Sequence, residues 1–412
     1  MLPSDPGSPV DDVPAARRVL RIGFVTETYP PEVNGVAVTV ARIIDELRAR
    51  NHAVELVRPR QHRFDGAAAG ERSDEVLMRG LPIPRYADLK MGLPSQRALM
   101  RLWTARRPDV VHIATEGPLG WSALQAARRL QLPISSDFRT NFHAYSRHYG
   151  VGWLRGPIMA YLRSFHNRAH CTMVPTEALR RDLADCGFRK LRVLARGVDT
   201  KLFDPDRRSD ELRRFWGARP GDLVMLHVGR LAPEKNLGVL VSAYRVMKRH
   251  DPRVRLVLVG DGPARRSLQA QCPEAHFAGM RTGEDLAAHY ASGDLFVFPS
   301  TTETFGNVTL EAMASGLPVL AYDYAAARLL IIPGVNGVLA RYDDARDLTL
   351  RAAQLAKDPA ALRDMGRRAR DTAGAMGWSR IVEQVEAVFA AIIRDGSGLG
   401  HETPRRERLE PL

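Results

Sequence analysis

One segment of the chain holds two glutamates, Glu303 and Glu311, separated by seven residues. The apolar run before Glu303 predicts a strand that ends at this loop, and a helix is expected to follow. Gly306 lets the backbone come close to a ligand, and the free N–H groups of residues 306–308 would point out of the helix start. Apolar residues follow Glu311, where a carboxylate needs a partner. The pattern favours a binding site, and the alternative for Glu311 is a solvated helix face.

Two cations occur in a second loop, residues 229–236, after the strand expected over Leu223–Val228. Arg230 can hold two oxygens with its planar fork, whereas Lys235 is a mobile point charge. Together they could neutralise a diphosphate leaving group. The alternative is a solvated, charged loop.

The first half offers two further loops. Residues 26–35 follow the strand expected over Val19–Val25, and Gly35 opens a helix whose N–H groups could bind a phosphate or a sugar hydroxyl. An ordinary strand–helix turn is the alternative. Residues 135–149 are dense in polar, basic and aromatic side chains, and His143 is the histidine most favoured to line a cleft.

Several kinds of catalytic site are missing from the sequence. It has no GxGxxG in the first strand–helix loop, no P-loop and no GxSxG elbow. No His, Cys and Glu cluster has the spacing of metal ligands. We therefore expect neither a metal ion nor a tightly bound cofactor.

Strand and helix patterns alternate along the chain in two series. Such alternation predicts parallel sheets with helices on both faces. The predicted fold class is α/β, with two doubly wound, Rossmann-like domains that face each other across a cleft. Ligands of such sheets bind beyond the carboxyl ends of the strands, where the loops above lie. The predicted parts are an arm over 1–18, a first domain over 19–199, a second domain over 200–377, a helix over 378–394 and a disordered tail over 395–412. Hinge residues are expected between Gly197 and Gly221.

Composition is that of a globular protein, with 45% hydrophobic and 26% charged residues among 412. Three scattered cysteines fit a reducing compartment. No apolar run is long enough for a membrane span, and residues 1–18 lack the apolar core of a secretory signal. We therefore expect a cytoplasmic protein.

The net charge of +13 is concentrated in the first half, where residues 1–199 carry 30 Lys and Arg against 20 Asp and Glu. Nucleic acid, an anionic membrane and a phosphorylated substrate are all consistent with that charge. A nucleic-acid-binding protein is disfavoured because no known module for it occurs. Residues 86–107 read as a basic amphipathic helix, which could lie on an anionic bilayer at the inner membrane face or simply cover the domain core.

Taken together, the motifs resemble the retaining glycosyltransferases of family 4, which have the GT-B fold. The likeness covers about residues 19–395 and rests on five segments in the family's order: PPEVNGV, RGVD, GRLAPEKN, VGDGP and the E-x7-E pair. The nearest likeness is to bacterial GDP-mannose-dependent alpha-mannosyltransferases, through residues 140–150 and 320–327.

The resemblance implies roles for individual residues. Arg230 and Lys235 would hold the donor diphosphate, Glu303 the donor sugar, and Glu311 the ribose hydroxyls. The remaining contacts to the donor would come from Gly35, Phe305, Gly306, Asn307, Val308, Met280 and Arg281.

On the acceptor side the resemblance points to Asn34, Arg139 and His143. Many relatives carry a histidine where this chain has Arg139, so the role of that histidine is assigned neither to Arg139 nor to His143.

The implied activity is transfer of a hexose, with mannose favoured, from a nucleotide diphosphate sugar to a hydroxyl acceptor, which could be a lipid or a lipid-linked glycan. Transfer would retain the anomeric configuration and would need no cofactor beyond the GDP-mannose or UDP-sugar cosubstrate. The alternatives are a UDP-sugar-dependent glucosyl- or sulfoquinovosyl-type transferase and a nucleotide-sugar epimerase or hydrolase. The Glu303 and Glu311 pair favours transfer.

Overall fold

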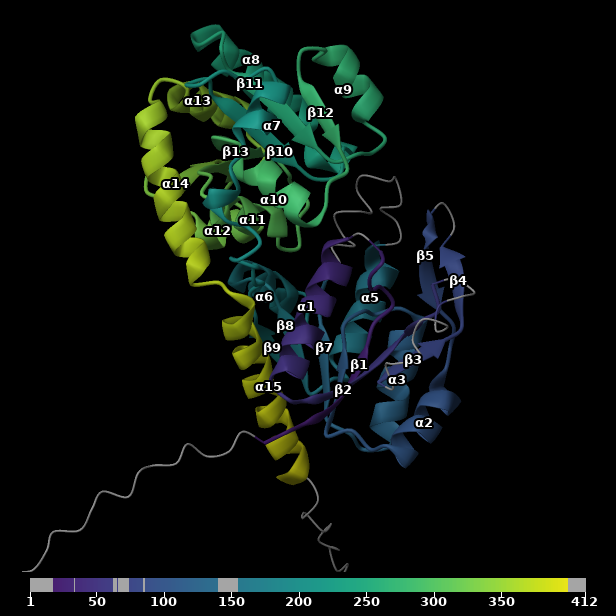
Figure 1. The fold of residues 1–412 in the computed structure, drawn as a ribbon. Helices are drawn as coiled ribbons and strands as arrows, with labels where there is room; N and C mark the ends of the chain where they lie inside the picture. The colour runs from purple at the N-terminus through teal and green to yellow at the C-terminus, as the bar shows by residue number, and fades with distance from the viewer. Residues whose placement is uncertain are drawn as a thin grey trace, which may run out of the picture.

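The computed structural model describes residues 18–32, 34–61, 65, 74–83, 86–139 and 155–398. They form two α/β domains stacked end to end, with the first domain in purple and blue below and the second in green above (Figure 1). The last helix, in yellow, runs from the second domain down along the first. The predicted fold class is confirmed.

The first domain is built, in its described residues, on a parallel sheet of seven strands in the order β3-β2-β1-β6-β7-β8-β9. Every residue of β6, β7 and β8 is buried, as expected for parallel strands covered on both faces. The strands are β1 (Arg21–Val25), β2 (Ala53–Pro59), β3 (Glu75–Met78), β6 (Val110–Ile113), β7 (Ile134–Asp137), β8 (Cys171–Val174) and β9 (Leu191–Val193). The helices are α1 (Gly35–Ala49), α2 (Gln96–Ala105), α3 (Pro118–Arg129), α5 (Arg155–His166) and α6 (Glu177–Asp185).

The second domain repeats this plan with six strands among its described residues, in the order β12-β11-β10-β13-β14-β15. The strands are β10 (Val224–Val228), β11 (Arg255–Val259), β12 (His276–Gly279), β13 (Leu295–Phe298), β14 (Val319–Tyr322) and β15 (Gly337–Ala340). The helices are α7 (Asp210–Phe215), α8 (Leu237–His250), α9 (Arg265–Gln271), α10 (Gly283–Ala291), α11 (Asn307–Ala314), α12 (Ala325–Leu330), α13 (Ala345–Leu355) and α14 (Pro359–Gly374), with short 3-10 turns η2 (Pro205–Arg207) and η3 (Pro233–Lys235). The strands expected over Val19–Val25 and Leu223–Val228 are confirmed as β1 and β10, whose first residues differ by two and one.

Helix α15 (Trp378–Gly398) crosses back onto the first domain, as the sequence predicts, and extends four residues beyond its expected end. Its apolar side completes the core around β1 and α1, and the Phe389 ring lies 5.6 Å from the His112 ring. Glu386 of α15 accepts hydrogen bonds from Arg50 at 3.1 Å and pairs with His52 at 2.8 Å. The C-terminal helix is therefore an integral part of the first domain.

The chain passes between the domains twice, and the two crossings pair with each other. The Val198 amide donates to the Met376 carbonyl at 3.0 Å, and Gly197 packs directly against Trp378. A Cβ on Gly197 would lie 2.7 Å from the Trp378 ring, so only glycine fits there.

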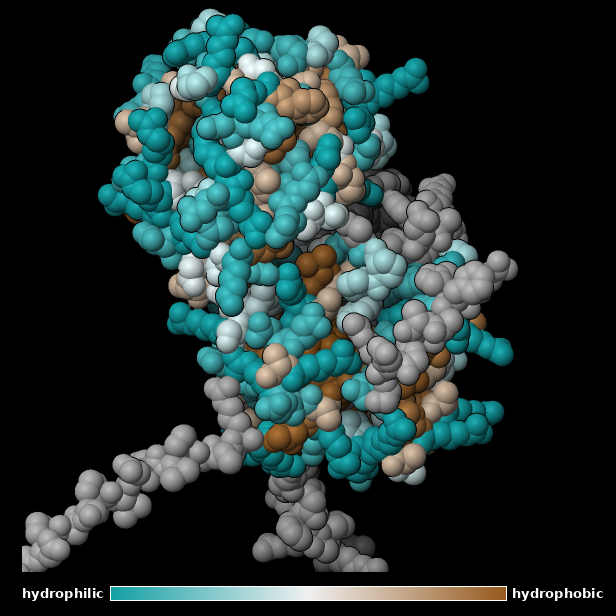
Figure 2. All heavy atoms as spheres, viewed as in Figure 1, coloured by the Kyte–Doolittle hydropathy of each residue, from teal (hydrophilic) through white to brown (hydrophobic). Residues whose placement is uncertain are grey.

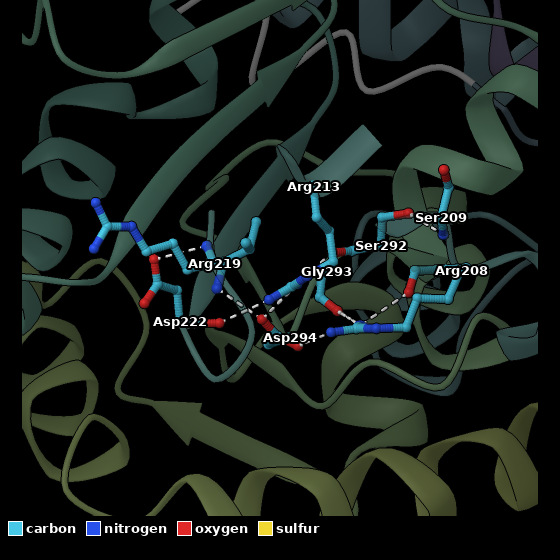
Figure 3. Close-up of polar contacts among 10 residues, drawn as sticks. Arg208, Ser209, Arg213, Arg219, Asp222, Ser292, Gly293 and Asp294 are labelled. Carbon is cyan, nitrogen blue, oxygen red and sulfur yellow. Dashed lines mark hydrogen bonds and ion pairs between the residues drawn. The ribbon is translucent and has the colours of Figure 1, made fainter. Parts of the chain in front are cut away.

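The segment that follows the first of these crossings belongs to the second domain. Arg208 and Arg213 both bond the Asp294 carboxylate, and Arg213 also donates to the Ser292 and Asp222 carbonyls (Figure 3). Arg370 adds bonds to three more carbonyls nearby. Within the range 197–221, where hinge residues are expected, Asp204, Arg208 and Arg213 are therefore bonded to the second domain, and the chain crosses between the domains at 197–199 and 376–378. The hinge itself stays a prediction.

Residues 75–92 hold three strands that the sequence did not predict. Strand β3 extends the main sheet, while β4 (Gly80–Ile83) and β5 (Tyr86–Gly92) form an antiparallel pair. The expected helix over 86–107 is wrong for its first half, since Pro94 separates the strand from α2 and disfavours helix at the residue before it. The side chains of Leu99 and Trp103 in α2 are fully buried in the domain core. Four arginines on and after α2 are exposed, namely Arg97, Arg101, Arg106 and Arg107.

Candidate active site

The loops singled out in the sequence meet where the carboxyl ends of the two sheets face each other. The Thr304 hydroxyl, in the loop after β13, donates to the Arg139 carbonyl after β7 at 3.1 Å. The Asn307 side chain at the start of α11 donates to the Thr39 hydroxyl of α1 at 3.3 Å. Loop 300–307 of the second domain therefore touches the first domain at two points.

Lys235 and Glu303 form an ion pair, although 68 positions separate them in the chain. The Lys235 ammonium also lies 5.4 Å from the centre of the Phe298 ring. Glu303 accepts a 2.6 Å hydrogen bond from the Ser300 hydroxyl, and its carbonyl accepts one from Tyr324 at 2.9 Å. The structure thus brings together a cation and a carboxylate that the sequence placed in separate loops.

Arg230 lies in the same loop as Lys235, with 39% of its side chain exposed. Its guanidinium bonds the buried Glu234 carboxylate at 2.5 Å. Burial alone would raise the pKa of Glu234, but the hydrogen bond from Arg230, a backbone hydrogen bond and the charges of Arg230 and Lys235 together outweigh it, and the pKa is lowered. Glu234 therefore stays ionised and can hold Arg230 in place, a role that the sequence did not indicate.

Three glycines let this cationic loop pack against the VGDGP turn. Gly229 and Gly260 have φ angles of 151° and 130°, which side chains rarely adopt. A Cβ on Gly260 would lie 2.0 Å from the Gly229 carbonyl oxygen, and one on Gly262 would lie 2.4 Å from that of Leu231. The two backbones are hydrogen-bonded, with Leu231 donating to Asp261 at 2.9 Å. The VGDGP motif therefore supports the loop that carries both cations.

Gly306, with φ of 92°, turns the chain into α11. The Phe305 side chain is buried in the second-domain core, and Val308 packs against the same core. Asn307 bonds the first domain, as described above. These residues position the start of α11 toward the cleft, while their expected contacts with a donor sugar stay a prediction.

Glu311 is not on a solvated helix face. The Tyr290 hydroxyl of α10 donates to it at 2.9 Å. Burial raises the pKa of Glu311 to about 7, and the Tyr290 hydrogen bond works in the opposite direction. Tyr290 is the partner that the apolar context of Glu311 required, and the sequence gave no sign of which residue it would be.

Met280 and Arg281 follow β12 at the same edge of the sheet. The Met280 side chain is 58% exposed. The Arg281 guanidinium folds back, donating to the Ala278 carbonyl at 2.8 and 3.0 Å and to Asp285 at 3.1 Å. The Arg281 side chain is therefore held by contacts within its own segment. A ligand could still contact the backbone of this segment and the Met280 side chain.

In the first domain, the start of α1 faces the start of α11, and a Cβ on Gly35 would lie 3.7 Å from the Asn307 amide nitrogen. Asn34 caps α1: its side-chain oxygen accepts from the Val36 and Ala37 amides, and its amide group donates to Thr28. This oxygen is therefore engaged in the cap.

Arg139 is buried and paired with Asp137 rather than displayed on an open surface. His143 lies outside the described residues. Among the described residues, no three His, Cys, Asp or Glu side chains group closely enough to hold a metal ion. No helix within the described ranges is both long and apolar enough to cross a membrane.

Comparisons with protein families identify both halves of the chain. Residues 33–202 match the family described as Glycosyltransferase Family 4, and residues 222–358 match Glycosyl transferases group 1.

Curated relatives agree with these matches. A GDP-mannose-dependent alpha-mannosyltransferase of Mycobacterium tuberculosis is 37% identical over 324 residues, which cover 78% of this chain and 83% of that protein. A sulfoquinovosyl transferase of Arabidopsis thaliana is 33% identical, covering 76% of this chain and 63% of its own. An alpha-monoglucosyldiacylglycerol synthase of Streptococcus pneumoniae is 28% identical, covering 78% and 75%.

Solved structures share the fold at low identity. The Anabaena protein Alr3699/HepE, solved in complex with UDP, is 20% identical, with a TM-score of 0.72 over 90% of this chain and all of that chain. Sucrose-phosphate synthase from Thermosynechococcus elongatus is 19% identical, with a TM-score of 0.72 over 91% and 99% of the two chains. From the matches to both domains and the relatives above 30% identity, the chain belongs to the family 4, group 1 glycosyltransferases.

Proposed function

We propose that this glycosyltransferase moves mannose from GDP-mannose to a hydroxyl acceptor, with retention of the anomeric configuration. The contact between Lys235 and Glu303 carries the proposal, because it joins a cation of the 229–236 loop to a carboxylate of the loop after β13. Arg230, the second cation of the 229–236 loop, is paired with Glu234. The relatives named as GDP-mannose-dependent alpha-mannosyltransferases, at 32–37% identity, support mannose and GDP.

The reaction breaks the bond between the sugar C1 and the phosphate oxygen and forms one between C1 and the acceptor oxygen. Arg230 and Lys235 balance the negative charge that grows on the departing diphosphate. Glu303 holds hydroxyls of the sugar, and Glu311 accepts hydrogen bonds from the ribose. The acceptor approaches the face that the diphosphate leaves, and its proton passes to a phosphate oxygen, so the products are GDP and the mannoside.

A donor panel tests this proposal. GDP-mannose, GDP-glucose, UDP-glucose and UDP-sulfoquinovose are compared by thermal shift and by release of the nucleoside diphosphate. A bound donor stabilises the folded chain by RT ln(1 + [L]/Kd), so the preferred donor gives the largest shift. Preference for GDP-mannose supports the proposal. Preference for a UDP-sugar would replace it with the second candidate, a UDP-sugar-dependent glucosyl- or sulfoquinovosyl-type transferase, whose sugars match the names of the Arabidopsis and Streptococcus relatives.

The acceptor is proposed to be a lipid or a lipid-linked glycan at the cytoplasmic face of a membrane. The four exposed arginines on and after α2 support an electrostatic contact, with ~1 kcal/mol for each cation near an anionic surface. Insertion of α2 is not part of the proposal, because Leu99 and Trp103 are buried in the core. On the face drawn in Figure 2, hydrophobic residues occur in small groups among hydrophilic ones.

Sedimentation with liposomes tests the membrane contact. The chain should sediment with anionic vesicles and not with neutral ones. Replacing Arg97, Arg101, Arg106 and Arg107 with Gln should abolish this difference, whereas Gln at four exposed arginines of α14 and α9 (Arg363, Arg367, Arg368 and Arg266) should preserve it. Equal recovery of the wild type in the supernatant with both vesicle types would refute the contact.

We also propose that no metal ion is needed, since Arg230 and Lys235 supply positive charge at the diphosphate. Turnover should then be unchanged after dialysis against a chelator. A loss that Mg²⁺ or Mn²⁺ restores would contradict this part of the proposal.

A further inference from the structure

A buried charged cluster lies at the carboxyl edge of the first-domain sheet. Asp137 ends β7, Arg139 follows two residues later, Arg196 follows β9, and His112 lies in β6. All three partners contact the same carboxylate oxygen of Asp137, Oδ2. Arg139 forms an ion pair with it, His112 Nε2 lies 3.5 Å away, and Arg196 Nη1 lies 3.8 Å away.

The charges in this cluster do not balance. Two guanidinium groups face one carboxylate, and none of the three side chains is more than 6% exposed. Burial, followed by repulsion from Arg139, lowers the pKa of Arg196 to about 9, which leaves it charged at neutral pH. Burial alone would raise the pKa of Asp137, but Arg139, His112 and Arg196 together outweigh it and hold that pKa well below its usual range. A net positive charge is therefore buried here, which is unfavourable unless an anion compensates it.

Hydrogen bonding in the cluster is also incomplete. The Arg139 Nε and the Asp137 Oδ1 are buried without a hydrogen-bond partner among the described residues. The 3.8 Å contact of Arg196 with Asp137 is too long for a hydrogen bond. Arg196 therefore donates no hydrogen bond to any described residue, although a guanidinium has five N–H donors. Since Asp137 already pairs with Arg139, what the two arginines lack is a second acceptor with negative charge.

The backbone of the cluster contacts the loop that carries Glu303. The Arg139 carbonyl accepts from Thr304, the residue after Glu303, so the backbone that carries Arg139 contacts the loop expected to hold the donor sugar. The donor diphosphate has its own cations, Arg230 and Lys235, on the second domain. The substrate that enters from the first domain is the acceptor.

We propose that Arg139 and Arg196 form a subsite for an oxyanion carried by the acceptor, either a carboxylate or a phosphate. This inference rests on the proposed function and adds a chemical class of acceptor to it. Both anions match the fork of a guanidinium, which donates two parallel N–H bonds. The Asp137 carboxylate fixes Arg139, and the bound anion supplies the second negative charge that the cluster lacks.

Acceptor kinetics test the subsite. The variant Arg196→Gln is compared with Arg192→Gln, which removes the same charge from an exposed position of β9. The acceptors are methyl glucuronide, glucose 6-phosphate and the neutral methyl glucoside. The wild type should prefer one charged acceptor, and this preference decides between carboxylate and phosphate. In Arg196→Gln the KM for that acceptor should rise ten- to a hundredfold, with no change for methyl glucoside or in the Kd of GDP-mannose.

Two outcomes would overturn the subsite. One is a wild type that prefers methyl glucoside, with kinetics that Arg196→Gln leaves unchanged. The other is a weaker Kd for GDP in Arg196→Gln at constant acceptor KM, because the anion would then be the donor diphosphate.

Thermal-shift measurements test the subsite independently of the transferase activity. Arg196→Gln should unfold at the same temperature as the wild type or higher, since it removes an uncompensated buried charge. Inorganic phosphate should stabilise the wild type and Arg192→Gln more than Arg196→Gln. A lower unfolding temperature for Arg196→Gln, with equal phosphate shifts in all three proteins, would mean that Arg196 is merely structural. If no nucleotide sugar binds while the phosphate difference persists, the proposed function fails and the anion site stands.

Discussion

The Tyr290 hydroxyl donates a 2.9 Å hydrogen bond to Oε2 of Glu311 and so joins α10 to α11. Because burial raises the pKa of Glu311 to about 7, the carboxyl exchanges between its protonated and ionised forms near neutral pH. Ribose hydroxyls donate to the ionised form. Binding of a nucleotide would therefore favour loss of the proton.

Nucleotide affinity should accordingly rise with pH from 6 to 8, by up to about tenfold, and level off above the pKa of Glu311. Calorimetry with GDP measures it. Glu311→Gln should bind with an affinity that does not change over this range, and Glu311→Ala should lose ~1.5–3 kcal/mol of binding free energy at pH 8. The exposed Glu284 provides a control, because Glu284→Gln should keep the wild-type profile. A flat profile in the wild type would contradict the assignment of the ribose to Glu311.

Removing either cation of the 229–236 loop should slow the chemical step. Arg230→Ala and Lys235→Ala are each expected to lower kcat by ~10²–10³ and to raise the KM of the donor far less, because the diphosphate gains charge mainly in the transition state. Steady-state kinetics with GDP-mannose measure both constants. Arg249→Ala, an exposed position on α8, should leave them unchanged. If both loop variants kept the wild-type kcat, the loop would be only a charged surface with no role in the chemical step.

The close packing of the cationic loop on the VGDGP turn depends on Gly260. Gly260→Ala should destabilise the second domain by more than ~2 kcal/mol, because its φ of 130° strains an L side chain and the new Cβ would overlap the Gly229 carbonyl. Gly238→Ala is a matched control in α8, where the space is open, and should stabilise by ~0.5–1 kcal/mol. Urea denaturation compares the two. Equal stability of Gly260→Ala and the wild type would show that the loops can separate freely.

Periodic apolar runs predicted the main strands and helices, and the strand ends placed Arg230, Lys235 and Glu303 at one edge. This reasoning could not predict which side chains far apart in the sequence would contact each other. Tyr290 and Glu311 meet because two helices pack side by side, and Arg196 meets Asp137 because β8 brings β7 and β9 within reach. The short strands β3 to β5 were missed because brief, partly exposed strands leave little periodicity in the sequence.

Helix α15 has a consequence for the order in which the chain can fold during synthesis. Residues near the start of the chain share a core with Trp378, Phe389 and Ile392, so that core stays incomplete until translation is nearly finished. Domains generally fold in order from the N-terminus as the ribosome proceeds. Here the second domain should reach its native state first, while the first domain waits for its last helix. A chain ending at residue 377 should therefore yield a protease-resistant second domain and a degraded first one, whereas a chain ending at residue 398 should resist as the full chain does.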